Sequence, residues 1–187
     1  MGIIFLNGCT SAGKTSIARA LQALPGSAWL RFGIDDGFAL LPPDSPDGFW
    51  FDRDERGLVH LNYGTLGRKA LAAYRRAAVA IAATGVDLVV DEVILEADFA
   101  DDWVALANDL DVFAVGVHCD LAELERRELQ RGDRRSGQAR GQFDLVHGRI
   151  AYDFEIDTTR ITPGVAAATI AAAYAGRGGP GVLSPRR

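Results

Sequence analysis

The residues with the clearest chemical potential lie near the start of the chain, where Gly8, Gly13, Lys14 and Thr15 follow the spacing Gly-x-x-x-x-Gly-Lys-Thr. Glycines let the backbone curl with its N–H groups pointing inward, where a side chain would block a phosphate. The lysine can reach the β- and γ-phosphates, and the threonine hydroxyl can hold Mg²⁺. The sequence therefore predicts an ATP-type triphosphate site formed by Gly8, Cys9, Thr10, Ser11, Ala12, Gly13, Lys14, Thr15 and Ser16.

The segments on either side of this loop have the pattern that a phosphate-binding loop requires. An apolar run at residues 3–6 predicts a buried strand, and the periodic pattern of residues 14–24 predicts a helix that ends before Pro25-Gly26. The helix adds the positive end of its dipole to the loop. The context of strand, glycine-rich turn and helix therefore favours a functional loop over a chance match.

Acidic residues follow two further predicted strands. Residues 86–90 form an aliphatic strand that ends in Asp91 and Glu92, which is typical of the Walker B position, where a carboxylate holds Mg²⁺ directly or through water. We assign the metal to Thr15 and Asp91, with Glu92 as the alternative carboxylate. A strand at residues 28–32 delivers Asp35 and Asp36 to the same edge of the sheet, where ligands bind in open parallel sheets, and only one of these neighbours should reach a substrate.

Arginines are concentrated between residues 126 and 140. Arg126 and Arg127 fit the solvated face of a helix. Arg131 and Arg134 differ because they lie at a helix end that carries a glycine and precede a flexible stretch. Guanidinium groups suit phosphoryl oxygens, so we interpret residues 131–142 as an arginine lid that closes on the triphosphate.

The segment at residues 41–63 is rich in proline, glycine and aromatic residues and is too long for an ordinary connection. It predicts a functional loop or a small hairpin. The cluster of Phe49, Trp50 and Phe51 is interpreted as a local core that holds this segment down, in preference to a substrate contact.

The remaining pattern alternates strands with helices. Helices are predicted at about residues 65–84, 97–109, 120–130 and 163–174, and strands at 112–119 and 154–157. This alternation predicts an α/β fold of the P-loop kinase type, with a doubly wound sheet of about five mainly parallel strands flanked by helices. Residues 1–175 should form a single domain, and the Gly/Pro/Arg-rich residues 176–187 should be disordered.

The composition restricts the range of partners. A net charge of −5 at pH 7 gives no indication of a nucleic-acid or anionic-membrane partner, and no apolar stretch reaches the length of about 18 residues that a membrane span needs. Cys9 and Cys119 cannot form a disulfide framework and are expected to be reduced thiols. A soluble, cytoplasmic protein is therefore expected; the oligomeric state is left open.

The sequence also resembles the chloramphenicol phosphotransferase family over nearly its whole length. The resemblance rests on the segments at residues 8–15, 32–35, 90–93, 116–120, 131–134 and 152–159, of which the last two are not general features of P-loop proteins.

The resemblance implies transfer of the γ-phosphate of ATP to a hydroxyl of an antibiotic, most simply chloramphenicol. It further implies that Asp35 is the catalytic base, that Arg131 and Arg134 are the lid arginines and that residues 41–63 bind the acceptor. Two alternatives remain open: a kinase of the same fold with another acceptor, such as a nucleotide sugar or a small metabolite, and a regulatory ATPase without an acceptor. The preference for ATP or GTP is also open.

Overall fold

Five parallel strands form the central sheet of this computed structural model, which describes residues 2–107, 110–131 and 135–184. The strands are β1 (Ile3–Asn7), β2 (Leu30–Gly33), β5 (Leu88–Glu92), β6 (Val112–His118) and β7 (Phe154–Asp157). They are arranged in the order β2-β5-β1-β6-β7. This arrangement confirms the predicted α/β fold with a five-stranded parallel sheet.

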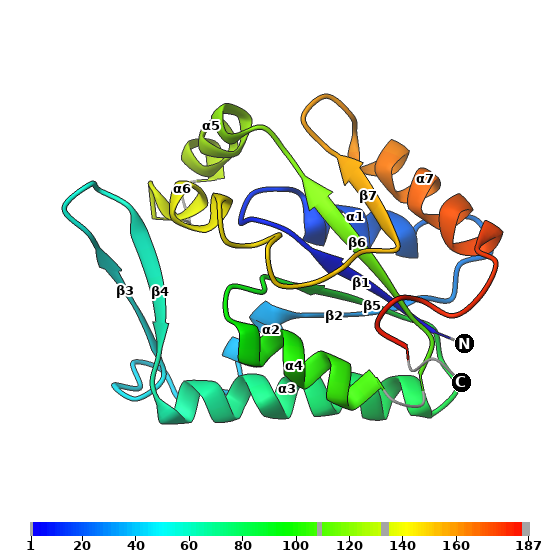
Figure 1. The fold of residues 1–187 in the computed structure, drawn as a ribbon, viewed down its shortest axis with the longest axis horizontal. Helices are drawn as coiled ribbons and strands as arrows, with labels where there is room; N and C mark the ends of the chain where they lie inside the picture. Colours follow the sequence, from blue (N-terminus) through cyan, green and yellow to red (C-terminus); the bar gives the residue numbers. More distant parts are fainter. Residues whose placement is uncertain (1, 108–109, 132–134, 185–187) are drawn as a thin grey trace.

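Helices cover both faces of the sheet (Figure 1). The longer helices are α1 (Lys14–Gln22), α3 (Thr65–Ala83), α4 (Ala97–Leu106), α5 (Leu121–Arg131) and α7 (Pro163–Gly176). Alternation along β1 places Ile4 and Leu6 in the core on the α1 and α7 side, whereas Ile3 and Phe5 pack on the α3 and α4 side. Both faces of β1 are fully buried, which explains its continuous apolar sequence.

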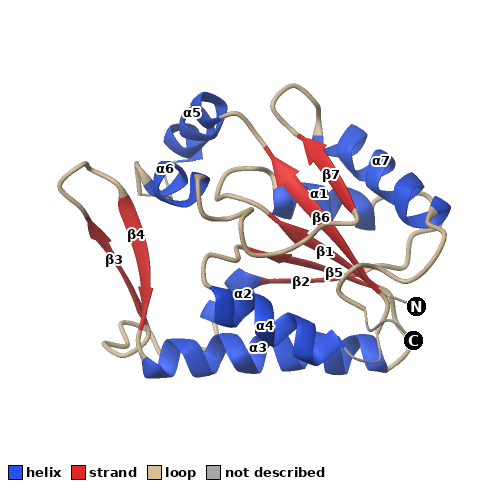
Figure 2. Ribbon diagram, viewed as in Figure 1, coloured by secondary structure: helices blue, strands red, loops and turns tan. Residues whose placement is uncertain are grey.

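Two short helices are absent from the predicted elements. Helix α2 (Ile34–Phe38) begins directly after β2, and α6 (Gln138–Phe143) lies in the segment that we interpreted as a lid. Figure 2 shows both as short helical segments beside the carboxyl ends of the strands. Helix α2 turns the chain immediately after β2, so Asp35 and Asp36 lie in its first turn.

The segment with the proline, glycine and aromatic residues contains the antiparallel hairpin of β3 (Phe49–Arg53) and β4 (Val59–Tyr63). This agrees with the hairpin interpretation. The ring of Phe49 packs 4.5 Å from that of Phe38, between centroids, whereas Trp50 is 46% exposed, so the aromatic cluster is only partly a core. The hairpin is also tied to the lid segment, because Arg53 donates to the Ser136 carbonyl at 2.8 Å.

Residues 177–184 belong to the segment for which the composition predicts disorder, and several of them form hydrogen bonds with residues at the starts of β6 and β7. The backbone N–H groups of Gly181 and Val182 donate to the carboxylates of Asp111 and Asp153, and the Ser184 hydroxyl accepts from the N–H of Val112 at 2.9 Å. These bonds satisfy the polar backbone of a segment whose composition alone suggested disorder. Within the described part of the chain, no helix is long and apolar enough to cross a membrane.

Candidate active site

The glycine-rich loop connects β1 to α1 as predicted. Gly13 has φ = +93°, a left-handed conformation that favours glycine. Gly8 is required for a different reason from the one expected: a Cβ there would lie 2.3 Å from the Val117 carbonyl oxygen on β6, so it permits close packing against the sheet. The Lys14 ammonium lies over the loop and donates to the carbonyls of Gly8 and Cys9 at 2.7 and 2.8 Å.

A cavity of about 80 Å³ lies above this loop, at the carboxyl end of the sheet. It brings together residues from the loop, α2, the hairpin, β5 and the end of α5, which are far apart in the sequence. Gly8, Cys9 and Ala12 belong to the loop but do not line the cavity. The cavity is lined by Thr10, Ser11, Gly13, Lys14, Thr15, Ser16, Ile34, Asp35, Phe38, Leu61, Tyr63, Asp91, Val93, Arg131, Gln138 and Gln142.

Asp91 and Glu92, which the sequence left as alternatives, point to opposite faces of β5. Asp91 is 4% exposed and accepts a hydrogen bond from the Thr15 hydroxyl at 3.3 Å. Glu92 lies on the α3 side, where Arg75 donates to it at 2.5 Å and the Trp103 indole N–H also donates at 2.5 Å. Asp91 is therefore the carboxylate that faces the cavity.

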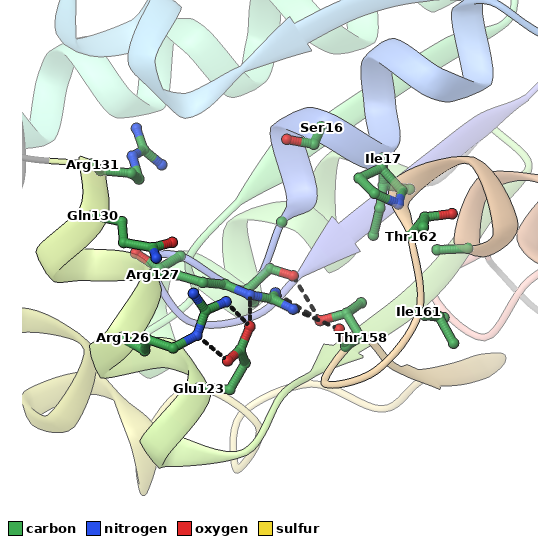
Figure 3. Close-up of a pocket in the computed structure, with 15 residues that line it drawn as sticks. Ser16, Ile17, Glu123, Arg126, Arg127, Gln130, Arg131, Thr158, Ile161 and Thr162 are labelled. Carbon is green, nitrogen blue, oxygen red and sulfur yellow. Dashed lines mark hydrogen bonds and ion pairs between the residues drawn. The ribbon is translucent and has the colours of Figure 1, made fainter.

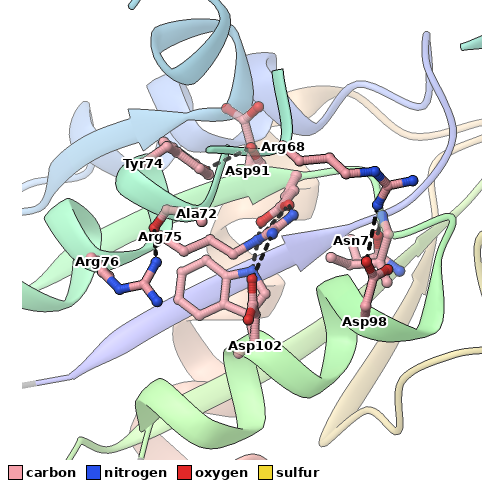
Figure 4. A network of polar contacts seen from close by, with 12 residues as sticks. Asn7, Arg68, Ala72, Tyr74, Arg75, Arg76, Asp91, Asp98 and Asp102 are labelled. Carbon is pink, nitrogen blue, oxygen red and sulfur yellow. Dashed lines mark hydrogen bonds and ion pairs between the residues drawn. The ribbon is translucent and has the colours of Figure 1, made fainter. Parts of the chain in front are cut away.

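Glu92 belongs to a buried polar network between β5, α3 and α4. Its partner Arg75 also donates to Asp102 at 3.2 Å (Figure 4). The guanidinium carbon of Arg75 lies 4.2 Å from the centroid of the Phe99 ring. Burial raises the pKa of Glu92, and the Arg75 charge opposes that rise. The hydrogen bonds of Glu92 to Arg75 and Trp103 hold the end of β5, which also carries Asp91, against α3 and α4.

Asp35 and Asp36 also separate by position. Asp35 lines the cavity. Asp36 instead accepts from the Gly33 N–H at 2.7 Å, so it caps the start of α2, and it lies 3.7 Å from an Arg31 guanidinium nitrogen. Of the two neighbouring aspartates, Asp36 therefore has a structural role as a helix cap, and Asp35 is the one that lines the cavity.

The arginines are arranged differently from the prediction at one position. Arg131 lines the cavity as expected, whereas Arg134 lies outside the described residues. Arg127 was assigned to a solvated face, and that is wrong: it donates to Glu123 at 2.7 Å and to the Thr158 carbonyl at 2.7 Å. These bonds fix its guanidinium group between α5 and the end of β7.

Arg127 forms part of a second, larger cavity of about 410 Å³ (Figure 3). Its walls come from the loop, α1, α5, the segment between β7 and α7 and the start of α7, including Gln130, Ile161 and Pro163. Ser11, Gly13, Ser16 and Arg131 line both cavities, so the two are neighbours across the glycine-rich loop. The larger cavity has the mixed apolar and polar walls that suit a nucleoside.

The oxygen atoms of Thr15 and Asp91 are suitable ligands for Mg²⁺. One carboxylate oxygen of Asp91, Oδ2, is buried without a hydrogen bond within the described residues, and it lies 3.7 Å from a guanidinium nitrogen of Arg31. The Ser11 hydroxyl is also buried without a partner there. Buried polar atoms normally have partners, and a carboxylate beside a threonine hydroxyl is the type of oxygen set that Mg²⁺ uses together with phosphate.

We expect Asp91→Asn to stabilise the protein in the absence of ligands. Burial raises the pKa of Asp91 despite the nearby Lys14 and Arg31 charges. Stability is therefore lost as the pH rises above the unfolded-state pKa, and the full cost is reached above the folded-state pKa. At pH 7 the variant should gain about 1 kcal/mol, or about 2–4 °C in Tm. The gain should shrink as the pH falls below the folded-state pKa of Asp91 and be gone near the lower, unfolded-state pKa. Thermal unfolding from pH 4 to pH 8 measures this, and an unchanged or lower Tm at pH 7 would contradict it.

Comparison with known proteins gives consistent results. Residues 1–175 match the family described as chloramphenicol phosphotransferase-like protein. A protein from two strains of Mycobacterium tuberculosis, provisionally named an O-phosphotransferase, is 36% identical over 168 residues, which cover 84% of this chain and 75% of the relative.

Solved structures with less sequence similarity share the fold. The APS kinase of Mycobacterium tuberculosis, in complex with AMPPNP and APS, has a TM-score of 0.65 at 17% identity and covers 94% of this chain and 98% of its own. The tunicamycin resistance protein of Deinococcus radiodurans has a TM-score of 0.64 at 20% identity and covers 99% of both chains. The chain therefore has the fold of P-loop kinases.

Proposed function

This chain belongs to the chloramphenicol phosphotransferase-like family, and we propose on that basis that it transfers the γ-phosphate of ATP to a hydroxyl of a small molecule, with chloramphenicol or a related antibiotic as the first candidate. The observation that carries the proposal is a single cavity lined by Lys14, Thr15, Asp35, Asp91 and Arg131. These residues supply the cations, carboxylates and hydroxyl that phosphoryl transfer requires.

ATP is proposed to lie across both cavities. The triphosphate would occupy the smaller cavity, where the loop N–H groups and Lys14 hold its oxygens, and the nucleoside would occupy the larger one beside Arg127. The positive end of the α1 dipole supports the same placement of negative charge.

In the proposed reaction, the acceptor hydroxyl oxygen attacks the γ-phosphorus while Asp35 accepts the hydroxyl proton. The bond between the γ-phosphorus and the bridging oxygen breaks, and ADP leaves with that electron pair. Arg131 and Arg134 would neutralise charge on the transferred phosphoryl group. Thr15 and Asp91 would hold Mg²⁺, which neutralises phosphate charge when bound. Positioning and electrostatics should account for most of the rate.

The alternatives differ in the molecule that receives the γ-phosphate of ATP. A kinase of the same fold could act on another alcohol, such as a nucleotide sugar or a small metabolite. A regulatory ATPase would hydrolyse ATP without an acceptor. The family description and the Asp35 carboxylate in the cavity favour the phosphotransferase.

Incubation with Mg-ATP and a panel of hydroxylated antibiotics, chloramphenicol included, tests the proposal. We expect mass spectrometry to detect a product with one added phosphate and an equal amount of ADP. ATP consumption that never depends on an added acceptor, including a wider metabolite panel, would contradict it and favour the ATPase.

A further inference from the structure

Buried polar groups without partners collect beside the phosphate site. In the described part of the chain, the buried side-chain atoms that lack a hydrogen bond are Ser11 Oγ, Asn62 Nδ2, the Tyr63 hydroxyl and Asp91 Oδ2. Under the proposed function, phosphate and Mg²⁺ would pair with Ser11 and Asp91. Asn62 and Tyr63 are neighbours on β4 and remain unexplained. An unpaired buried donor is costly, so these two adjacent donors are candidates for binding a ligand.

The two residues line adjoining spaces. Tyr63 lines the small cavity with Asp35, and Asn62 lines a groove of about 490 Å³ between the hairpin, the segment after β5 and α6. Leu61 and Gln142 line both spaces, so the groove continues into the cavity. A molecule with its hydroxyl beside Asp35 would therefore extend into the groove.

The charges of the groove disfavour an anionic ligand. Asp52, Asp54 and Glu96 line it. Although desolvation raises the pKa of Asp54, hydrogen bonds from the Leu58 N–H, His60 and Arg56 lower it to about 2, so this group is ionised at neutral pH.

The groove's guanidinium group, on Arg53, already has protein partners. It donates to the carbonyls of Gly57 and Ser136. His60, which also lines the groove, contacts Asp54 at 3.3 Å. The lining thus carries three carboxylates and one guanidinium group. Asp54 is paired with Arg56 at 3.2 Å and Glu96 with Arg68 at 2.7 Å, which leaves Asp52 to disfavour a bound carboxylate or phosphate.

Building on the proposed phosphotransferase function, we infer that the acceptor is an uncharged or amine-bearing molecule rich in oxygen atoms, and that the Asn62 amide and the Tyr63 hydroxyl donate hydrogen bonds to it. Burial raises the pKa of Tyr63, so its hydroxyl keeps the proton that this bond requires. Carbonyl, ether or hydroxyl oxygens of the acceptor would satisfy both donors. The same surface disfavours anionic sugars and nucleotide-linked acceptors.

The inference about the charge of the acceptor can be tested with acceptors that differ mainly in charge. Glucosamine, glucose and glucuronate share one scaffold, and a library of hydroxylated antibiotics and metabolites extends the comparison. With Mg-ATP, we expect the best acceptors to be neutral or amine-bearing, and kcat/KM for carboxylate or phosphate analogues to be at least about 10-fold lower. Best acceptors that carry a carboxylate or phosphate would overturn the inference but leave the proposed phosphotransferase intact. No transfer to any compound would overturn both.

Variants test the two donors with the best acceptor found. Tyr63→Phe removes only the hydroxyl, and Asn62→Asp replaces the donor with an acceptor of the same shape. Each should raise KM for the acceptor about 10-fold or more, with an unchanged Kd for ATP. Tyr174→Phe, which removes a hydroxyl far from the groove beside Arg177, is the matched control. Unchanged acceptor KM in both folded variants would overturn the donor assignment.

Discussion

An Asp35→Asn enzyme is expected to bind Mg-ATP normally and to lose about 10²- to 10⁴-fold in kcat, which is the usual contribution of a general base. The asparagine has the same shape but cannot take the acceptor proton. Because Asp35 lines the cavity with Lys14 and Arg131, its loss should affect the chemical step and leave nucleotide affinity unchanged. Steady-state turnover, together with nucleotide titration by calorimetry, measures both quantities.

Asp36→Asn is the matched control for that experiment. Its side chain caps α2 through the Gly33 N–H, and the asparagine carbonyl can accept the same bond. We expect kcat within about 3-fold of the native enzyme, since caps of this type change helix stability by about 1 kcal/mol or less when an acceptor is kept. Equal turnover of the native and Asp35→Asn enzymes would remove Asp35 from the base role, and a large loss only in Asp36→Asn would exchange the two residues.

Lys14→Met is expected to reduce kcat/KM by at least about 10²- to 10³-fold, the effect of removing one preorganised electrostatic contact to a transition state. Lys14 is 7% exposed, and its ammonium lies over the loop on the Gly8 and Cys9 carbonyls. When ATP is bound, the same charge should neutralise the β- and γ-phosphates.

The chain contains one other lysine, Lys69, which lies on the exposed side of α3 and provides the control. Lys69→Met should have native activity and a native Tm. The Tm of Lys14→Met must be measured as well, because its two carbonyl acceptors lose a donor. A folded Lys14→Met enzyme with native kcat/KM would contradict the proposed triphosphate site.

The regular part of the fold was predictable because its signals are local. The apolar strands and the long periodic helices follow directly from residue patterns, and the resulting sheet agrees with the prediction. The two short helices were missed because each contains a glycine, Gly37 or Gly141, that local rules treat as a helix breaker. In the structure, a Cβ at Gly37 would lie 2.9 Å from Tyr74 and one at Gly141 would lie 2.4 Å from the Val59 carbonyl oxygen. The glycines therefore serve close packing, which sequence alone does not reveal.

The site was predictable where a motif defines it. The loop residues, Asp35, Asp91 and Arg131 could be proposed from spacing, position and family resemblance. Arg127 could not, because its partner Thr158 is 31 residues away. The choice between Asp91 and Glu92 depends on which face of β5 is covered by α1, and only the folded sheet gives that information.

Gln142 links the two halves of the site. Its side-chain carbonyl accepts a hydrogen bond from the Thr10 N–H at 2.8 Å, one of the loop amides that a phosphate would use, and its side chain also lines the acceptor groove. A triphosphate that takes over this amide would release Gln142 toward the groove. The two substrates would then be thermodynamically coupled through one side chain, and by linkage each would change the affinity of the other by the same factor. Ordered addition, with nucleotide before acceptor, is the kinetic behaviour that such an arrangement favours.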